Sequence, residues 1–168
     1  MPRLDELFQM TKGKIFINLE IKDNRKDVVF PVLVEYITKY DMFDQMELSS
    51  FNHGYYDLIK EYNGKHEKKI VFGFLYKKGK GNVEDLKLGF PLNTLNIYRE
   101  DVTKEKVDLA HKNNMAVMAW FKMKDNDNED TFNNLLDMGV DAICTNEPVK
   151  AREAVERYYS NKSNSCNK

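Results

Sequence analysis

The chain has 168 residues, 42% of them hydrophobic and 12% aromatic, which is typical of one globular domain with a sizeable core. Its 26 Lys and Arg residues against 27 Asp and Glu residues give a formal net charge of -1. The overall charge therefore gives no electrostatic reason to expect nucleic acid or an anionic membrane as a partner. No stretch approaches the roughly 18 consecutive apolar residues of a membrane span, residues 1–6 do not resemble a secretory signal, and the 2 Cys residues form no disulfide framework. We expect a cytoplasmic protein.

The pattern of apolar residues alternates between strands and helices six times along the chain. The predicted strands are residues 15–22, 46–51, 70–76, 94–98, 115–121 and 141–145, and the predicted helices are 27–40, 53–62, a short one from about 82, 104–112, 129–138 and 148–159. Strands that each precede a helix favour βαβ units and a parallel sheet, either open and doubly wound or closed into a barrel. No GxGxxG or GxxxxGK[ST] turn follows a strand, which weakens nucleotide-binding interpretations.

Helix ends carry their usual signals. Thr103 suits the first cap of helix 104–112, and Gly139 suits the end of helix 129–138, while Asn63 and Gly64 are expected to stop helix 53–62. The tail, residues 160–168, is polar and is expected to be disordered. We therefore expect one α/β domain over residues 1–159 and a tail after it.

The first predicted strand separates its side chains onto two faces. Alternation places four aliphatic side chains on one face, and Glu20 and Lys22 on the other, near the carboxyl end of the strand. Ligands of parallel α/β proteins bind at that end, so a carboxylate and an ammonium there indicate a site for a metal ion or an anion. The alternative is an edge strand whose outer face is simply in water.

Other candidates each have a structural alternative. His53 could act as a base, but no carboxylate orients it in the local sequence, and Asn52 beside it is a plausible helix cap. Trp120, the single tryptophan, could form the wall of a pocket or could pack in the core. Cys144 is expected to be a small core residue.

Several stretches together resemble the glycerophosphodiester phosphodiesterase family. They are PRLDEL at residues 2–7, LEIK at 19–22, SSFNH at 49–53, AW at 119–120 and LDMGVDAICTNEP at 136–148, in the order in which that family has them. The resemblance covers roughly residues 1–157. It implies a (β/α) barrel of TIM type, a site at its carboxyl-end rim, and metal-dependent hydrolysis of glycerophosphodiesters to glycerol 3-phosphate and an alcohol, a reaction of lipid metabolism.

By the same resemblance, Glu20 matches the family's third metal carboxylate, Lys22 a lysine near the phosphate, and Trp120 an aromatic side chain of the substrate pocket. The implied cofactor is a divalent cation, Mg²⁺ or Ca²⁺, and the implied partner is a small glycerophosphodiester or phosphate ligand. One departure follows Trp120, where the family often has WTVN and residues 120–123 read WFKM.

A larger departure is an absence in the sequence. The family's His-Arg-Gly strand, Glu-x-Asp metal pair and His-Asp motif do not occur, so this chain has no residue that matches a catalytic histidine. A barrel of this type takes about 250 residues, and this chain holds about six of its eight βα units. With Glu20 as its one matching metal carboxylate, weak cation binding is expected. Two open sheet edges would also favour self-association or pairing with a missing N-terminal segment.

Three functions stay open at this point. The chain is a part of a phosphodiesterase that is inactive alone, or a non-catalytic remnant that binds a phosphate ligand or a protein. The third uses Lys22 as a Schiff-base nucleophile, which would require Lys22 to be desolvated.

Overall fold

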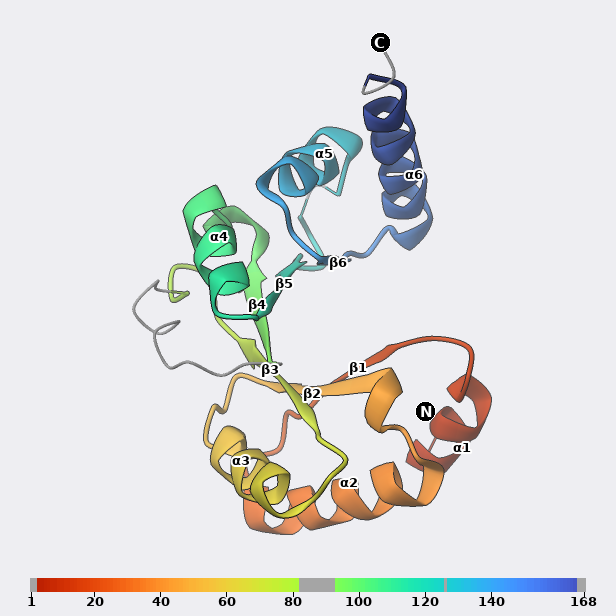
Figure 1. The fold of residues 1–168 in the computed structure, drawn as a ribbon, viewed down its shortest axis with the longest axis vertical. Coiled ribbons are helices and arrows are strands. Elements are labelled where there is room, and N and C mark those ends of the chain that lie inside the picture. Colours follow the sequence, from red (N-terminus) through yellow and green to blue (C-terminus); the bar gives the residue numbers. More distant parts are fainter. Residues whose placement is uncertain (1–2, 82–92, 126, 166–168) are drawn as a thin grey trace. The chain divides into compact units, whose positions relative to one another are not determined.

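The computed structural model describes residues 3–81, 93–125 and 127–165, which form two compact units, residues 1–75 and 76–168. The predicted short helix from about residue 82 lies outside the described residues. Within each unit parallel strands alternate with helices, as the sequence predicts (Figure 1).

The first unit consists of helices α1 (Leu4–Thr11), α2 (Lys26–Tyr40) and α3 (Tyr55–Lys65), the short 3-10 helix η1 (Phe43–Gln45), and strands β1 (Ile17–Glu20), β2 (Met46–Ser50) and β3 (Val71–Leu75). The strands are neighbours in chain order, and both pairs are parallel. Figure 1 shows α2 and α3 on one side of these strands. Leu48, Phe72 and Ile59 are fully buried, so the core lies between the strands and these helices.

The second unit has strands β4 (Thr94–Tyr98), β5 (Ala116–Trp120) and β6 (Ala142–Cys144), the 3-10 helix η3 (Arg99–Asp101), and helices α4 (Lys104–Lys112), α5 (Glu129–Met138) and α6 (Pro148–Ser165). Its strands are again parallel and in chain order. Val107 of α4, Val117 and Ala119 of β5, and Phe132 of α5 are fully buried. Apolar helix faces therefore cover one face of this sheet.

The predicted ends of α4 and α5 are confirmed. The Thr103 hydroxyl accepts the Lys106 N–H at 3.3 Å, and the Asn128 side chain accepts the Thr131 N–H at 2.9 Å. Gly139 ends α5 with φ +89°, a conformation that side chains with a Cβ adopt only at a cost.

Three features differ from the prediction. Helix α1 was not expected; its short sequence is stabilised by the Arg3 N–H, which donates to the Glu6 side chain at 2.8 Å, and by Phe8, which is fully buried. Asn63 does not stop α3, because its amide bonds both the N–H and the carbonyl of Ile70. Cys144 is exposed and not a core residue, because β6 is at the edge of its sheet.

Helix α6 also continues past residue 159, so residues 160–165 of the expected disordered tail are helical. The Ser160 and Ser163 hydroxyls donate to the carbonyls of Glu156 and Tyr159, at 2.8 and 2.9 Å. These polar residues therefore form hydrogen bonds within the helix, which the polar composition of the segment alone does not predict. The division of the chain into residues 1–159 and a separate tail stays a prediction.

Two glycines provide a matched test of this backbone. Replacing Gly139 by Ala should destabilise the second unit by about 1 kcal/mol, because an L side chain is strained at φ +89°. Gly64 lies inside α3, and a Cβ added there would meet no atom within 4 Å, so Gly64→Ala should stabilise the first unit by about 0.5–1 kcal/mol. Urea unfolding followed by circular dichroism measures both changes. Equal signs for the two substitutions would contradict this interpretation.

Candidate functional site

Glu20 and Lys22 lie at the carboxyl end of β1, as predicted. The Lys22 ammonium is 3.6 Å from the Glu20 carboxylate. The Lys22 side chain is 79% exposed and that of Glu20 is 35% exposed. Because both side chains are exposed, they are accessible to a ligand. An exposed pair of this kind contributes little to stability.

Strand pairing determines the direction in which Glu20 points. Glu20 lies opposite Ser49, and Asn18 opposite Glu47, on the same face of β1 and β2. The Ser49 hydroxyl donates to the Asn18 side chain at 2.5 Å, which confirms that these polar groups share one face. Leu19 alternates with them and belongs to the face that the helices cover.

The backbone after Glu20 is held by β2. The Ile21 N–H donates to the Ser49 carbonyl at 2.7 Å, and the Ser50 hydroxyl donates to the Ile21 carbonyl at 2.8 Å. Both serines are buried. The pair of serines therefore positions the segment that carries Glu20 and Lys22, which is a structural use of the SSFNH stretch.

His53 and Lys22 do not have the surroundings that catalysis by either would require. The His53 Nε2 lies 2.9 Å from the Leu75 carbonyl, so this nitrogen is a donor to the backbone, and the ring packs edge-on against Phe74. The Lys22 side chain is mostly in water, whereas a Schiff-base lysine has to be desolvated. The Schiff-base interpretation is therefore not supported.

Trp120 lies in the second unit, at the carboxyl end of β5. Its ring is half-buried and lies 5.1 Å from the ring of Tyr98, and its indole N–H donates to the Tyr76 carbonyl at 3.2 Å. The ring therefore packs against Tyr98 and is held by the backbone at one edge, and a role for Trp120 as a pocket wall stays a prediction.

Tyr98 is the centre of a charged cluster that the sequence did not indicate. Its hydroxyl donates to the Asp125 carboxylate at 3.0 Å, and the ammonium groups of Lys122 and Lys78 lie 4.6 and 5.2 Å from its ring centre. Burial, and then the bond to Asp125, raise the pKa of Tyr98. Burial also raises the pKa of Asp125, but the Lys122 N–H, the Tyr98 hydroxyl and Arg99 outweigh it, so the pKa of Asp125 lies below its ordinary value.

Asp127 joins two loops at the same end of this unit. Asp127 is buried, with 8% of its surface exposed, and its carboxylate accepts the Thr145 hydroxyl and also the Asn146 N–H at 2.7 Å. The Asn146 side chain donates in addition to the Lys122 carbonyl at 2.9 Å. Asp127 therefore fixes the TNEP stretch, residues 145–148, from a loop that none of the family-like stretches includes.

The signals for Tyr98, Asp125 and Asp127 are weak in the sequence, because each partner is far away along the chain or in an irregular loop. Position alone offers one indication, since all three follow or end a predicted strand. Glu20 and Lys22 belong to the first unit, and Trp120 belongs to the second with these three residues.

A divalent cation would need several oxygen ligands, and the described residues do not provide them. Over residues 3–81, 93–125 and 127–165, no group of three or more His, Cys, Asp or Glu side chains could hold a metal ion. Glu20 alone does not fit a metal ion, which takes about six oxygen ligands or more. No chemical step can therefore be assigned to a metal in this chain by itself.

The fold and the site together define a class of protein. Parallel strands alternate with helices, and polar side chains gather at the carboxyl ends of the strands, which is the arrangement of (β/α) proteins of TIM type. The chain belongs to the glycerophosphoryl diester phosphodiesterase family, whose model matches residues 1–150. The predicted family and the predicted incomplete (β/α) barrel are both confirmed. No curated protein matches the chain.

Solved structures of similar fold carry the same family assignment. One from Galdieria sulphuraria, assigned as a glycerophosphodiester phosphodiesterase, has a TM-score of 0.76 and 25% identity, over 90% of this chain and 63% of that one. One from Silicibacter pomeroyi has a TM-score of 0.74 and 21% identity, over 93% and 56%. A glycerophosphodiester phosphodiesterase from Parabacteroides distasonis has 0.71 and 20%, over 96% and 65%. The chain thus spans less than two thirds of the length of these three proteins.

Asp23 follows Glu20 and Lys22 in the chain, and the pKa of its carboxylate tests whether its ion pair with Arg25 forms. The Arg25 guanidinium bonds the Asp23 carboxylate, with 2.6 Å between the closest atoms, and lowers the pKa of Asp23 from 3.8 to about 2. Because the folded-state pKa is depressed, the stabilisation is present above about pH 4 and is lost as the pH falls toward 2. Carboxyl NMR titration should give a pKa of about 2 for Asp23. Arg25→Gln should raise that pKa toward 3.8, and Lys26→Gln should leave it unchanged; an unchanged pKa in Arg25→Gln would show that the pair does not form.

Proposed function

We propose that this chain is one part of a metal-dependent hydrolase of small glycerophosphodiesters, which forms glycerol 3-phosphate and an alcohol in lipid metabolism. The chain supplies part of the site and does not hydrolyse the substrate alone. The observation that carries this proposal is the exposed pair of Glu20 and Lys22 at the carboxyl end of β1, in a chain that belongs to the phosphodiesterase family.

Each residue has a role that follows from its chemistry. Glu20 provides one oxygen ligand toward a divalent cation, Mg²⁺ or Ca²⁺, which in the complete site would neutralise charge on the phosphate. Lys22 is an exposed point charge that can approach a phosphate oxygen. Trp120 offers its ring to the apolar part of the substrate, because its polar N–H is already bonded to the Tyr76 carbonyl.

The groups that this chain does not supply to the proposed reaction are a general acid and a general base. Hydrolysis of a phosphodiester needs a group that activates the nucleophile and one that protonates the leaving alcohol. His53 is bonded to the backbone, His66 lies 2.9 Å from the Tyr62 carbonyl, and His111 is paired with Asp141, so none of the three matches such a role. We propose that these groups come from βα units that have no match in this chain. A cytoplasmic location remains part of the proposal. Among residues 3–81, 93–125 and 127–165, none of the helices has the length and hydropathy of a membrane span.

Hydrolysis by the purified chain tests this proposal. Incubated with glycerophosphocholine and millimolar Mg²⁺ or Ca²⁺, the chain should release no glycerol 3-phosphate above the rate of a blank without protein, because acid and base groups are absent. Glu20→Gln and the control Glu35→Gln, an exposed position on α2, should behave alike. Turnover that Glu20→Gln abolishes and Glu35→Gln preserves would overturn the proposal that this chain needs further units.

A second function, binding of a phosphate ligand without catalysis, is favoured by the exposure of Lys22 in the absence of matching histidines. Titration calorimetry with glycerol 3-phosphate should then show binding that Lys22→Gln weakens at least fivefold. Lys60→Gln, at an exposed position on α3, is the matched control and should leave the affinity unchanged. No heat with or without Mg²⁺ or Ca²⁺ would count against this second function.

A further inference from the structure

Lys122 lies two residues after Trp120, just beyond the carboxyl end of β5, and its backbone is held at three points. Its N–H donates to the Asp125 carboxylate at 2.6 Å, and its carbonyl accepts the Asp125 N–H at 3.0 Å and the Asn146 side chain at 2.9 Å. The Lys122 side chain is exposed, and its ammonium lies 4.6 Å from the centre of the Tyr98 ring. The loop therefore presents a positive charge beside the aromatic rings at the carboxyl ends of β4 and β5.

The charged groups around Lys122 already have partners. The Lys78 ammonium pairs with the Glu100 carboxylate. The Arg99 guanidinium lies 3.3 Å from Glu100 and 3.5 Å from Asp125. Each of the three carboxylates in this region is bonded to a cation or an N–H group: Glu100, Asp101 and Asp125. Among the described residues the Lys122 ammonium forms no ion pair, so its charge is available to an anion.

The aromatic rings at this place are surrounded by positive charge. Tyr98 and Trp120 lie side by side, with ring centres 5.1 Å apart, and aromatic faces of this kind can bind a quaternary ammonium. Two ammonium groups are already near the Tyr98 ring, that of Lys122 at 4.6 Å and that of Lys78 at 5.2 Å from its centre. A cationic group of a ligand would meet like charges here, whereas an anionic group would meet the Lys122 ammonium. The surroundings therefore favour an anion over a cation.

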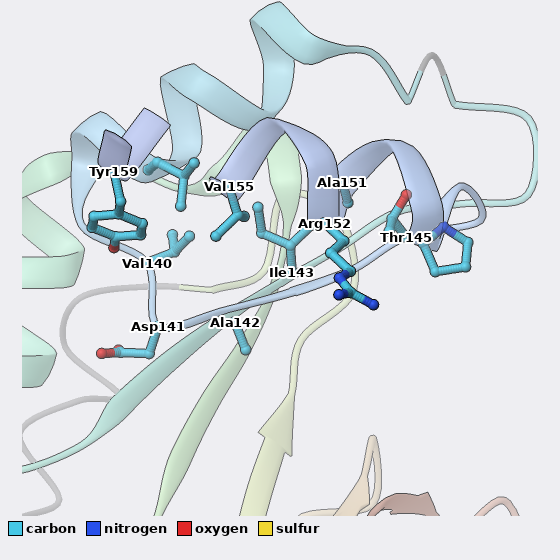
Figure 2. Close-up of a pocket in the computed structure, with 11 residues that line it drawn as sticks. Val140, Asp141, Ala142, Ile143, Thr145, Ala151, Arg152, Val155 and Tyr159 are labelled. Atoms are coloured by element: carbon cyan, nitrogen blue, oxygen red, sulfur yellow. The ribbon is translucent and has the colours of Figure 1, made fainter. Parts of the chain in front are cut away.

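Another surface of the second unit has a different chemistry. A groove of about 270 Å³ lies between β6 and α6, and Figure 2 shows Val140, Ile143 and Val155 pointing toward the space between the strand and the helix. Arg152, the cation in its lining, pairs with Glu156 at 3.0 Å. The groove is therefore suited to apolar groups, and it does not offer an anion what Lys122 offers.

We propose that Lys122, beside the rings of Trp120 and Tyr98, determines which head group the substrate carries. It selects a glycerophosphodiester whose alcohol bears a further anionic group and disfavours choline or another quaternary ammonium. This inference rests on the proposed function, since the head group is the alcohol that the hydrolysis would release. Lys122 belongs to residues 120–123, WFKM, where this chain departs from the WTVN of the family, so the family resemblance assigns it no role.

Fluorescence of Trp120 tests this inference, because Trp120 is the one tryptophan of the chain and can be excited apart from the tyrosines. The probes are glycerophosphoinositol 4-phosphate, glycerophosphoinositol and glycerophosphocholine. They share the glycerophosphodiester and carry an anionic, a neutral and a cationic head group. Titrated into the full chain, the first should bind about tenfold more tightly than the second, because a charge-assisted hydrogen bond to Lys122 is added. Glycerophosphocholine should bind no more tightly than glycerophosphoinositol.

Variants assign the preference to one side chain. Lys122→Met removes the charge and keeps an unbranched side chain, so the preference for the anionic probe over the neutral one should fall to about twofold or less. Lys124→Met, at an exposed lysine of the same loop, is the matched control and should leave the preference unchanged. Lys122→Glu should reverse the order, so that glycerophosphocholine binds more tightly than glycerophosphoinositol 4-phosphate. Thermal unfolding confirms that each variant is folded.

Three results would overturn the inference. The first is equal affinity for the anionic and the cationic probe, and the second is an equal loss of preference in Lys122→Met and Lys124→Met. The third is unchanged Trp120 fluorescence with all three probes at millimolar concentration.

Failure of the proposed function is seen separately. Lys22→Gln, in the first unit, should leave the ratio of the affinities for the anionic and the neutral probe unchanged, even where it lowers both affinities. The turnover assay, repeated with glycerophosphoinositol 4-phosphate, should still release no glycerol 3-phosphate above the blank. Turnover would contradict the proposed need for further units and would leave the order of the three affinities as it is.

Discussion

The parallel pairing of β1 with β2 is the constraint on which the candidate site depends. It sets Leu19 opposite Leu48 and Glu20 opposite Ser49, so that aliphatic and polar side chains separate onto two faces. A shift of one residue in this register would turn Glu20 into the apolar layer, where an isolated carboxylate is costly. The apolar layer therefore fixes the direction of the carboxylate more firmly than the ion pair with Lys22 does, since that pair is exposed.

Much of the fold and part of the site could be predicted from the sequence, and the reasons are local. The start of α4 and the end of α5 follow from Thr103 and Gly139, whose roles depend on the nearest turn of backbone. Glu20 and Lys22 follow from alternation within one strand. Contacts beyond the nearest turn of backbone could not be predicted: Asn63 bonds Ile70, seven residues along the chain, instead of stopping α3, and Tyr98 bonds Asp125, 27 residues along. Such partners are chosen by tertiary packing, which a local pattern does not encode.

Cys144 illustrates a different limit. A small apolar residue in a predicted strand is expected in the core, and the same residue in a central strand such as β5 would be buried. At the edge of the sheet it is exposed. The sequence pattern identifies a strand but not its position in the sheet, and burial depends on both.

The units that have no match in this chain would resolve two deficits at once. The first is at Glu20, because among the described residues no group of three or more His, Cys, Asp or Glu side chains could hold a metal ion. The second is at β6, a short edge strand with an apolar groove beside it. In a barrel whose site lies at the carboxyl ends of its strands, a strand that covers such an edge also places its last residues at the rim of the site. Any strand that paired in parallel with β6 would end at the same rim as Trp120, because β6 already lies beside β5.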